Sequence, residues 1–573
     1  MIINNFYQDV LRDYQNNIDS QIFFDPQTGA VYEPGREDGT PKFLFTEVTG
    51  YAILDFLLLH AITGEDEYLA RARKCADWLI NAAQDPCGGV LTRFYGDQDH
   101  RADLRDMSFA GGRIFAFDTA ICLKGLTALY DATQEEQYLT SANAMATFLT
   151  ELLMPDGRKV YARYDAVRAM PVEDDPQRWS RRFGAFHTKV AEALIDLYAV
   201  THDARCRSAA EAICTQALTF QAPRGNFETS PGRTDLHPHG YAVEGLLHVG
   251  AQLRNDAFVA AAQRATAWAL DQCRAGEIAQ DFDFESGAPR SRFRTDALAQ
   301  ILALAADLCR MGQLDRMYLP QMDELAFKIL QMKSAHGYFR YGYYQQEFKN
   351  GVQAETVSYW TNMFCLRALY KYYMAHVLDH TYVIILAGGI GSRCWPISCE
   401  NLPKPLSFSL LGDRTLLQET IRRFTHDSFL KPTQVWVLGT AQGLAETKAQ
   451  AAQEGIPEHN IMVENTPLGT IPATFQALKA LPQDQDPERL LIISMADNII
   501  EPYRRFQQAL IAALFAAREA PCLISIGKSL DLPDAEDRRF GHMVYGEAMG
   551  TYRVHTVDRF EEKPDHPTLA ELR

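Results

Sequence analysis

A repeated helical hairpin constrains the fold of this chain more than any other sequence feature. Four stretches, beginning at residues 57, 126, 194 and 246, each contain the end of an apolar helix, a short polar turn and a second helix with apolar residues three and four positions apart. A unit of this kind cannot bury its apolar faces alone, so neighbouring units must stack on one another. The repeat therefore predicts that the first two thirds of the chain is all-α.

A second pattern predicts how many hairpins there are. At six places an aromatic or apolar residue precedes a polar residue that opens an apolar helix: Glu47, Asp118, His187, His239 (with His237 beside it), Asp296 and Glu355. The intervals are 52 to 71 residues, which is enough for two helices and a connection. Six helical pairs predict a closed (α/α)6 toroid over residues 1–378. Glycine and aromatic residues in the connections predict short β-turns or hairpins.

The polar residues at the six helix starts are candidates for a pocket of the size of a sugar. In a closed ring they meet at one mouth, together with the positive ends of the helix dipoles. Aspartate and glutamate at a helix start are also ordinary caps, so a structural role is the alternative for each one alone. Histidine is not a strong cap, and a cleft that contains Glu, Asp and His can do general acid and base chemistry.

After residue 378 the composition changes from alanine-rich helix to alternating strands and helices. Strands are predicted at YVIILAGG, QVWVLGT and RLLIISMADNII, and helices at LLQETIRRF and LAETKAQAAQEG. This alternation predicts a parallel sheet in an α/β Rossmann-like domain over residues 379–573, with ligands at the carboxyl ends of its strands. The glycines of AGGIGSR let backbone N–H groups approach a phosphate, and Arg393 adds a forked positive charge.

Five motifs of this last third resemble those of the sugar-1-phosphate nucleotidyltransferases, in the same order. VIILAGGIGSRCWPISCENLPKPL resembles the opening signature, and its Trp-Pro-x-Ser portion is most similar to the mannose-1-phosphate guanylyltransferases. VENTPLGTIPA, MADNII, FGHMVYGE and RFEEKPD resemble the later motifs. The resemblance implies transfer of a nucleotidyl group, GMP from GTP, to a sugar 1-phosphate, mannose 1-phosphate, with release of pyrophosphate and with Mg²⁺ or Mn²⁺ as the metal.

The same resemblance assigns roles to individual residues. It implies that Arg393 and Lys404 neutralise the triphosphate, that Asp497 binds the metal and that Lys563 meets the sugar phosphate. It implies that the nucleotide contacts Leu386, Ala387, Gly388, Gly389, Gly391, Ser392, Arg393, Lys404, Gly469, Thr470 and Pro472.

The helical two thirds resembles the six-hairpin sugar enzymes in architecture and repeat. These include the N-acylglucosamine 2-epimerase group and the unsaturated glucuronyl hydrolases. In the epimerase group a histidine pair moves the proton, which implies His187 and His239 here, although the last inner helix offers Glu355. For hydrolysis the implied pair is Asp118 and Asp296. The sequence leaves open whether the toroid is an epimerase, an isomerase, a hydrolase or a binding module.

Departures from the family pattern keep an alternative open for the last third. Proline follows Lys404 where mannose-type enzymes usually have glutamine, Cys394 replaces the usual leucine, and Asn498 replaces histidine. The chain stops at Arg573, where relatives continue with a sugar-binding wall and a second acidic metal ligand. The alternative is a degenerate domain that binds a nucleotide or nucleotide sugar and regulates the toroid. A further alternative is that these residues are a piece of a longer gene product.

Composition limits the classes of molecule that this chain is expected to bind. The formal charge of −17, without a basic stripe, argues against nucleic acid. The amino terminus has no signal-peptide pattern and no apolar run approaches the roughly 20 residues of a membrane span, so a soluble, cytoplasmic protein is expected. Eleven cysteines scattered without a CxxC pair predict neither structural disulfides nor a zinc site. The expected partners are a nucleoside triphosphate and a sugar phosphate, and the sequence leaves homo-oligomers open.

Overall fold

A computed structural model describes most of the chain. The described residues are 6–18, 23–34, 41–94, 113–175, 179–285, 293–334, 336–342, 358–388, 398–399, 402–407, 412–426, 429–464, 469–482, 486, 488–501, 503–519, 522–527, 541–548 and 554–562. No helix among these residues is long and apolar enough to cross a membrane.

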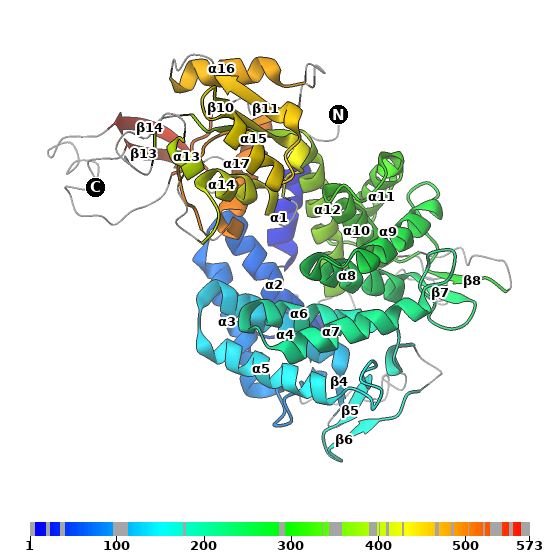
Figure 1. Ribbon diagram of the computed structural model, residues 1–573. Coiled ribbons are helices and arrows are strands. Elements are labelled where there is room, and N and C mark those ends of the chain that lie inside the picture. Colours follow the sequence, from blue (N-terminus) through cyan, green and yellow to red (C-terminus); the bar gives the residue numbers. More distant parts are fainter. Residues whose placement is uncertain are drawn as a thin grey trace.

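Twelve helices form the lower body of the molecule in Figure 1 as an inner and an outer ring. Each inner helix packs against the next, and α12 contacts both α10 and α2, which closes the ring. The inner helices are α2 (Thr46–Thr63), α4 (Ala116–Thr133), α6 (Thr188–Thr201), α8 (Leu236–Leu253), α10 (Thr295–Arg310) and α12 (Tyr359–Asp379). The outer helices are α1 (Phe6–Ile18), α3 (Asp66–Trp78), α5 (Glu136–Glu151), α7 (Ala204–Ala217), α9 (Asp256–Asp271) and α11 (Leu319–Gln331). The predicted (α/α)6 toroid is confirmed.

Inner and outer helices differ in how many of their residues are buried. In α4, 12 of the 18 residues are buried, whereas in α3 only 5 of the 13 are, so α4 must be covered on most sides and α3 on one. Small residues let the inner helices cross closely. A Cβ atom added at Gly125 would lie 2.8 Å from the carbonyl oxygen of Gly50, and one at Gly245 would lie 2.3 Å from that of Thr188.

The polar turns between paired helices have a common geometry. Helices α2, α4, α6 and α8 each end at a residue in the left-handed region: Gly64, Gln134, His202 and Arg254, with φ between 53° and 81°. An acidic or amide residue then begins the next helix, and Asp203 and Asn255 cap it with their side chains. These turns are the short polar segments that the repeat predicts.

Small antiparallel sheets join one helical pair to the next, as the glycine and aromatic residues of the connections predict. They contain β1 (Tyr32–Pro34), β2 (Pro41–Phe45) and β3 (Arg93–Phe94); β4 (Arg113–Phe115), β5 (Arg163–Asp165) and β6 (Met170–Val172); and β7 (Arg233–Asp235) with β8 (Asp281–Asp283). Short helices complete the description: η1 (Leu79–Ala83), η3 (Trp179–Arg181), η4 (Ala185–His187), η5 (Leu218–Phe220), η6 (Arg316–Tyr318), η10 (Pro432–Gln434) and η11 (Glu458–Asn460).

The last third forms an α/β body around a four-stranded parallel sheet. The strand order is β11 (Ile461–Glu464), β10 (Val435–Thr440), β9 (Thr381–Leu386) and β12 (Leu490–Met495). The chain proceeds from β9 through β10 to β11 on one side and returns to β12 on the other. The direction therefore reverses at β9, and in such sheets ligands bind beyond the carboxyl ends of the strands at that point.

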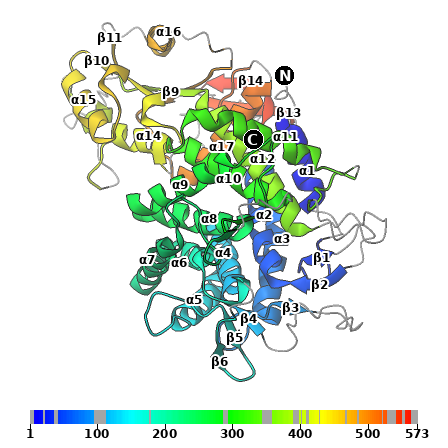
Figure 2. The same cartoon turned by 90° about the vertical axis from the view of Figure 1, so that its right-hand side faces the viewer.

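Five helices and a hairpin accompany this sheet. The helices are α13 (Lys404–Ser407), α14 (Leu416–Thr425), α15 (Leu444–Gln453), α16 (Thr470–Ala480) and α17 (Tyr503–Glu519), and the antiparallel hairpin joins β13 (Gly541–Ala548) to β14 (His555–Glu562). The strands and helices that the sequence predicts in this part are present. Figure 2 shows this body beyond the rim of the toroid.

One continuous apolar core joins the two bodies. Helix α17 packs against α2 and α12 of the toroid. The buried ring of Phe515 contacts Tyr370 at 6.2 Å and Tyr373 at 5.0 Å between ring centroids. Gln434 donates hydrogen bonds to the carbonyl oxygens of Leu378 and Thr381, on both sides of the short link between α12 and β9.

Candidate functional sites

Lys404 and Asp497 meet at the carboxyl edge of the parallel sheet. Asp497 follows β12 and Lys404 opens α13, and the lysine Nζ lies 3.6 Å from the carboxylate Oδ2. Their side chains are 30% and 46% exposed, so both are accessible to a ligand. Two of the residues implied by the family resemblance thus lie in contact with each other, next to the end of β9.

The first glycine of the predicted phosphate loop faces the end of β11, which lies two strands away from β9 in the sheet. A Cβ atom at Gly388 would lie 3.1 Å from Oε2 of Glu464, which ends β11. Leu386 and Ala387 are buried, and the backbone N–H of Ala387 donates to the carbonyl oxygen of Leu438, so both continue the sheet. Glu464 is an acidic residue at this edge that was not among the residues predicted from the sequence, although it lies in the motif VENTPLGTIPA that supplied Gly469, Thr470 and Pro472.

Gly469, Thr470 and Pro472 begin helix α16 beside the same edge. Gly469 has φ of +99° and caps the helix, and no neighbouring atom lies within 4 Å of a Cβ built on it. All three residues are exposed. The free N–H groups of a helix start attract anions, so this segment is suited to a phosphate. Gly389, Gly391, Ser392, Arg393 and Lys563 lie outside the described residues.

A buried arginine supports the loop that carries Asp497. Arg423 of α14 is 1% exposed, and its guanidinium donates a short hydrogen bond to the carbonyl oxygen of Asn498. Burial lowers the pKa of Arg423, and its guanidinium also lies 5.4 Å from the ring of Phe506. The sequence reasoning missed this residue because an arginine in an amphipathic helix usually faces solvent. Its only signal was the adjacent pair Arg422-Arg423.

Asp497 suits a hard divalent cation in this setting. It is an exposed carboxylate with a cationic neighbour at the ligand edge of the sheet, and Mg²⁺ is usually bound through one or two carboxylates together with substrate phosphates. The described residues thus fit the metal that the family resemblance implies.

In the toroid, two carboxyl groups share one buried region at the start of α2 and α4. Glu47 and Asp118 are 6% and 5% exposed. Trp360 donates to Glu47 at 2.9 Å, and the hydroxyl of Thr92 donates a short hydrogen bond to Asp118. Burial, followed by repulsion from Asp118, raises the pKa of Glu47 well above its usual value, and burial raises the pKa of Asp118 to about 6. The protonated form is therefore favoured at both groups.

Asp296 has the opposite environment. Burial disfavours its charge, but Arg294 and then His237 outweigh burial and lower the pKa of Asp296. The Nε atom of Arg294 lies 3.0 Å from Oδ1 of Asp296, and His237 lies 3.9 Å from the other carboxylate oxygen. Asp118 and Asp296, the pair implied for hydrolysis, thus differ in charge near pH 5, which is how acid and base roles are separated.

His237 contacts a polar side chain of the neighbouring inner helix α10, whereas His187 and His239 accept hydrogen bonds from backbone N–H groups. His237 Nδ1 is 2.6 Å from Oε1 of Gln300, and its ring lies 4.5 Å from that of Tyr241. His187 accepts a hydrogen bond from the N–H of Gly184, and His239 accepts one from the N–H of Phe227. Burial lowers the pKa to about 3 for His187 and to about 4 for His237 and His239.

A small cavity lies beside His239. This cavity of about 10 Å³ is lined by Phe183, Gly184, Phe227 and His239, among others, which suits one water molecule rather than a sugar. His187 and His239 thus remain predictions for proton transfer. Glu355, the acid predicted at the last inner helix, lies outside the described residues.

Charged side chains fill the interior of the ring next to these groups. Lys189 lies 2.5 Å from Glu192 and 3.1 Å from Glu244, and Lys124 lies 2.7 Å from both Glu192 and Asp196. These residues come from α4, α6 and α8, and Gln300 of α10 connects Glu244 to His237. The polar network extends from His237 into the ring, so the toroid is packed along this path rather than open as a pore.

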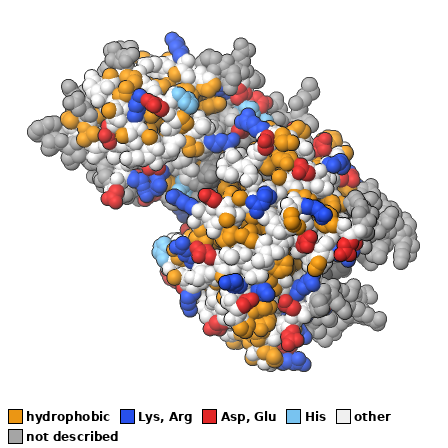
Figure 3. All heavy atoms as spheres, turned by 45° about the vertical axis from the view of Figure 1, so that its right-hand side comes forward, with side chains coloured by type: hydrophobic (Ala, Val, Ile, Leu, Met, Phe, Trp, Pro, Cys, Tyr) orange, Lys and Arg blue, Asp and Glu red, His pale blue; other side chains and the backbone are white. Residues whose placement is uncertain are grey.

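The surface has no single-sign stripe on the face shown in Figure 3. Lysine and arginine alternate with aspartate and glutamate over that face of the toroid. Such a mixture gives no continuous track for a phosphate backbone.

Comparisons with known proteins agree with both architectures. Residues 382–572 match the family model described as nucleotidyl transferase. The alginate biosynthesis protein AlgA of Pseudomonas aeruginosa is 32% identical over 191 residues, which are 33% of this chain and 38% of that protein. Mannose-1-phosphate guanylyltransferase of Klebsiella pneumoniae is 34% identical over 186 residues, which are 32% of this chain and 37% of that protein. The chain thus spans less than two fifths of each relative's length.

The toroid has a fold known from solved structures. A sugar epimerase from a ruminal bacterium superposes with a TM-score of 0.53 at 12% identity, covering 65% of this chain and 99% of that one. At this identity the likeness concerns the fold alone. The chain therefore joins an (α/α)6 toroid to a nucleotidyl transferase domain that is similar to the mannose-1-phosphate guanylyltransferases.

Proposed function

We propose that residues 379–573 transfer a guanylyl group from GTP to mannose 1-phosphate and release pyrophosphate, with Mg²⁺ or Mn²⁺ as the metal. The observation that carries this proposal is the contact between Lys404 and Asp497 beside the end of β9. The similarity of this part to guanylyltransferases supports the choice of nucleobase and sugar. These substrates are cytoplasmic metabolites, so we place the activity in the cytoplasm.

The side chains at this edge would act by position and charge. Lys404 offsets negative charge on the triphosphate, and backbone groups at Gly388 and at the start of α16 bind phosphate oxygens. Asp497 would hold the metal, which supplies further charge neutralisation when bound. In-line displacement at phosphorus needs alignment and charge stabilisation more than covalent help, so these groups suit the reaction. Arg393, Lys563 and the remaining loop glycines stay predictions in the same roles.

A substrate panel tests the transferase proposal. The protein is incubated with Mg²⁺, each of several nucleoside triphosphates and each of several hexose 1-phosphates, and pyrophosphate release is measured. The expected result is fastest release with GTP and mannose 1-phosphate. Nucleotide binding without release for any pair would instead favour the alternative of a degenerate domain that regulates the toroid.

For residues 1–378 we propose a toroid that binds and isomerises or epimerises a sugar. The opposite shifts in the pKa of Asp118 and Asp296 support acid and base chemistry at this mouth. The contacts of His237 with Gln300 and Asp296 add a third candidate for proton transfer. The fold shared with a sugar epimerase is consistent with this class of reaction.

Deuterium exchange distinguishes the candidate reactions of the toroid. Free hexoses and hexose-containing disaccharides are incubated with the protein in D₂O and followed by NMR. Isomerisation or epimerisation through proton abstraction next to the carbonyl exchanges that hydrogen for deuterium, whereas hydrolysis releases a monosaccharide without exchange. Neither exchange nor hydrolysis, with a sugar-induced rise in melting temperature, would indicate a binding module.

A further inference from the structure

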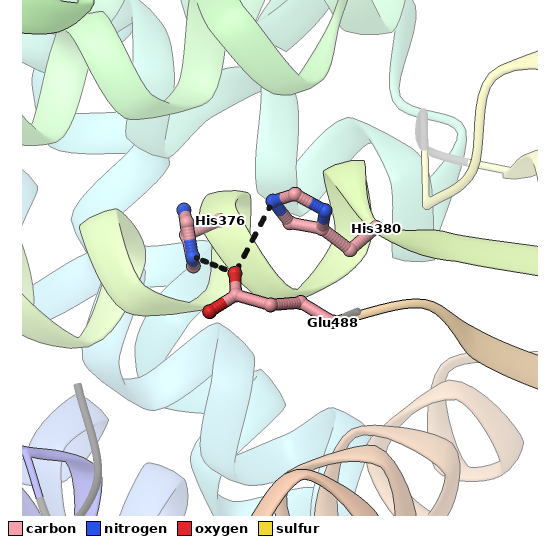
Figure 4. Close-up of side chains that lie close together, drawn as sticks. All are labelled: His376, His380 and Glu488. Atoms are coloured by element: carbon pink, nitrogen blue, oxygen red, sulfur yellow. Dashed lines mark hydrogen bonds and ion pairs between the residues drawn. The ribbon is translucent and has the colours of Figure 1, made fainter. Parts of the chain in front are cut away.

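Two histidines and a glutamate meet where α12 leads into the sheet (Figure 4). His376 lies in the last turn of α12, His380 follows that helix directly, and Glu488 precedes β12. The Nε2 atom of His376 lies 3.2 Å from Oε2 of Glu488, and that of His380 lies 3.7 Å from it. All three ligand atoms lie within 4.8 Å of one another. Ligand atoms about 2.0 Å from a tetrahedral zinc ion are roughly 3.3 Å apart, which is close to the two distances to Glu488.

A second carboxylate orients one of the imidazoles. The Nδ1 atom of His380 lies 2.8 Å from Oδ2 of Asp486. When Nδ1 donates its proton to Asp486, the lone pair is on Nε2, the atom near Glu488. Metal-ligating histidines are usually held by such a carboxylate, which fixes the tautomer and raises the basicity of the ligand.

Arg518 of α17 places a positive charge next to Glu488 and His376. Its Nη2 atom lies 2.7 Å from Oε2 of Glu488 and 3.3 Å from Nε2 of His376. The Nε2 atom carries either a proton or a lone pair, so it cannot make good hydrogen bonds to both the carboxylate and the guanidinium. A dication in this place would satisfy both Nε2 and Oε2 through their lone pairs.

We propose that His376, His380 and Glu488 bind a zinc ion at the junction between the toroid and the transferase domain, with the Arg518 side chain displaced. Two imidazoles and a carboxylate suit zinc among the common divalent ions, and the fourth position is left for water. The ligand side chains are 27% to 39% exposed, so an ion can reach them from solvent.

This site is separate from the metal site proposed at Asp497. Glu488 precedes β12 and Asp497 follows it, so the six residues of the strand, about 20 Å, lie between them. The ion would hold α12 to the start of β12 and so fix the toroid against the nucleotide-binding sheet. The test of this site does not depend on transferase activity.

Calorimetric titration of the full, EDTA-treated protein with zinc chloride tests the site. We expect one tight site. Binding should weaken at least about 100-fold in His376→Asn and His380→Asn and about 10- to 100-fold in Asp486→Asn. The matched control is His202→Asn at an exposed histidine of the toroid, which should leave this binding unchanged. Absence of a tight site in the wild type, or its persistence in both ligand variants, would overturn the proposal.

Two further measurements test the site, the first of them on the wild-type protein alone. Wild-type protein titrated with Co²⁺ should show visible absorption without the intense near-ultraviolet band of a cysteine ligand. Arg518→Gln should bind zinc more tightly than the wild type, because it removes the competing cation. Weaker binding by Arg518→Gln would show that the cluster is an ion-pair network and not a zinc site. A cysteine band with Co²⁺ would overturn the proposal by placing the ion at a cysteine outside the cluster.

Discussion

At the scale of single residues, the buried carboxyl groups of the toroid have the clearest electrostatic character. Asp118 is almost fully buried, and burial raises its pKa from 3.8 to about 6. The folded protein therefore binds a proton at Asp118 more tightly than the unfolded chain does. The contribution of this group to stability is greatest at low pH, and it is lost as the pH rises from about 4 to about 6.

Asp118→Asn removes this dependence on pH. At pH 7 the wild type carries a buried charge that asparagine lacks, so the free energy of unfolding should rise on the order of 2 kcal/mol in the variant. At pH 4 the two proteins should differ little. Urea denaturation at both pH values measures the difference, and a difference that is the same at both would contradict the raised pKa. Activity of the toroid should fall in the same variant if Asp118 transfers a proton.

Which residues of a motif face the site could not be predicted from the sequence. His237 and His239 are two positions apart at a helix start, so their side chains lie on nearly opposite sides of α8, about 200° apart. The sequence reasoning selected His239, and the structure shows that His237 contacts Gln300 and Asp296. The helix phase is set by packing against α9 and α10, which is a tertiary property. The contacts of Arg423 and of the cluster at Glu488 could not be predicted either, because the residues that meet there are far apart in the chain.

At the scale of elements, most of the architecture could be predicted. Hairpin turns such as Gly64-Glu65 and the alternating apolar segments after residue 378 depend on local chemistry, so the toroid and the parallel sheet were both expected. The crossing points of the inner helices could not be predicted, because a glycine within a helical sequence does not indicate which other segment packs against it. Gly245 is such a point, since the Thr188 backbone approaches it to within 2.3 Å of an added Cβ atom.

Gly245→Ala should therefore destabilise the toroid strongly. The added methyl group meets backbone atoms of α6, which cannot move without shifting that helix, and we expect a loss of at least about 3 kcal/mol. Gly240→Ala on the same helix is the matched control, since the three atoms nearest to its methyl group belong to the side chain of Gln300, the nearest at 3.0 Å. Melting temperatures of the two variants measure the contrast. Equal temperatures would mean that α6 and α8 are not in this close contact.

At the scale of the whole molecule, the shared core implies that the two bodies unfold together. Phe515 is fully buried between α17 and α12, and Phe515→Ala should cost about 3–5 kcal/mol and loosen the junction. We expect calorimetry to show one thermal transition in the wild type and two in the variant. Phe56→Ala, a buried position inside the toroid, should lower the melting temperature without splitting the transition. Two transitions in the wild type would contradict a shared core.

The most direct test of nucleotidyl transfer at the edge of the sheet is the rate of pyrophosphate release by Asp497→Asn. With GTP, mannose 1-phosphate and Mg²⁺, we expect the variant to lose at least about 100-fold in rate, because it loses a charged metal ligand beside Lys404. Asp413→Asn, at an exposed aspartate before α14, should stay within about twofold of the wild type. Wild-type release that persists in Asp497→Asn would contradict the proposed site.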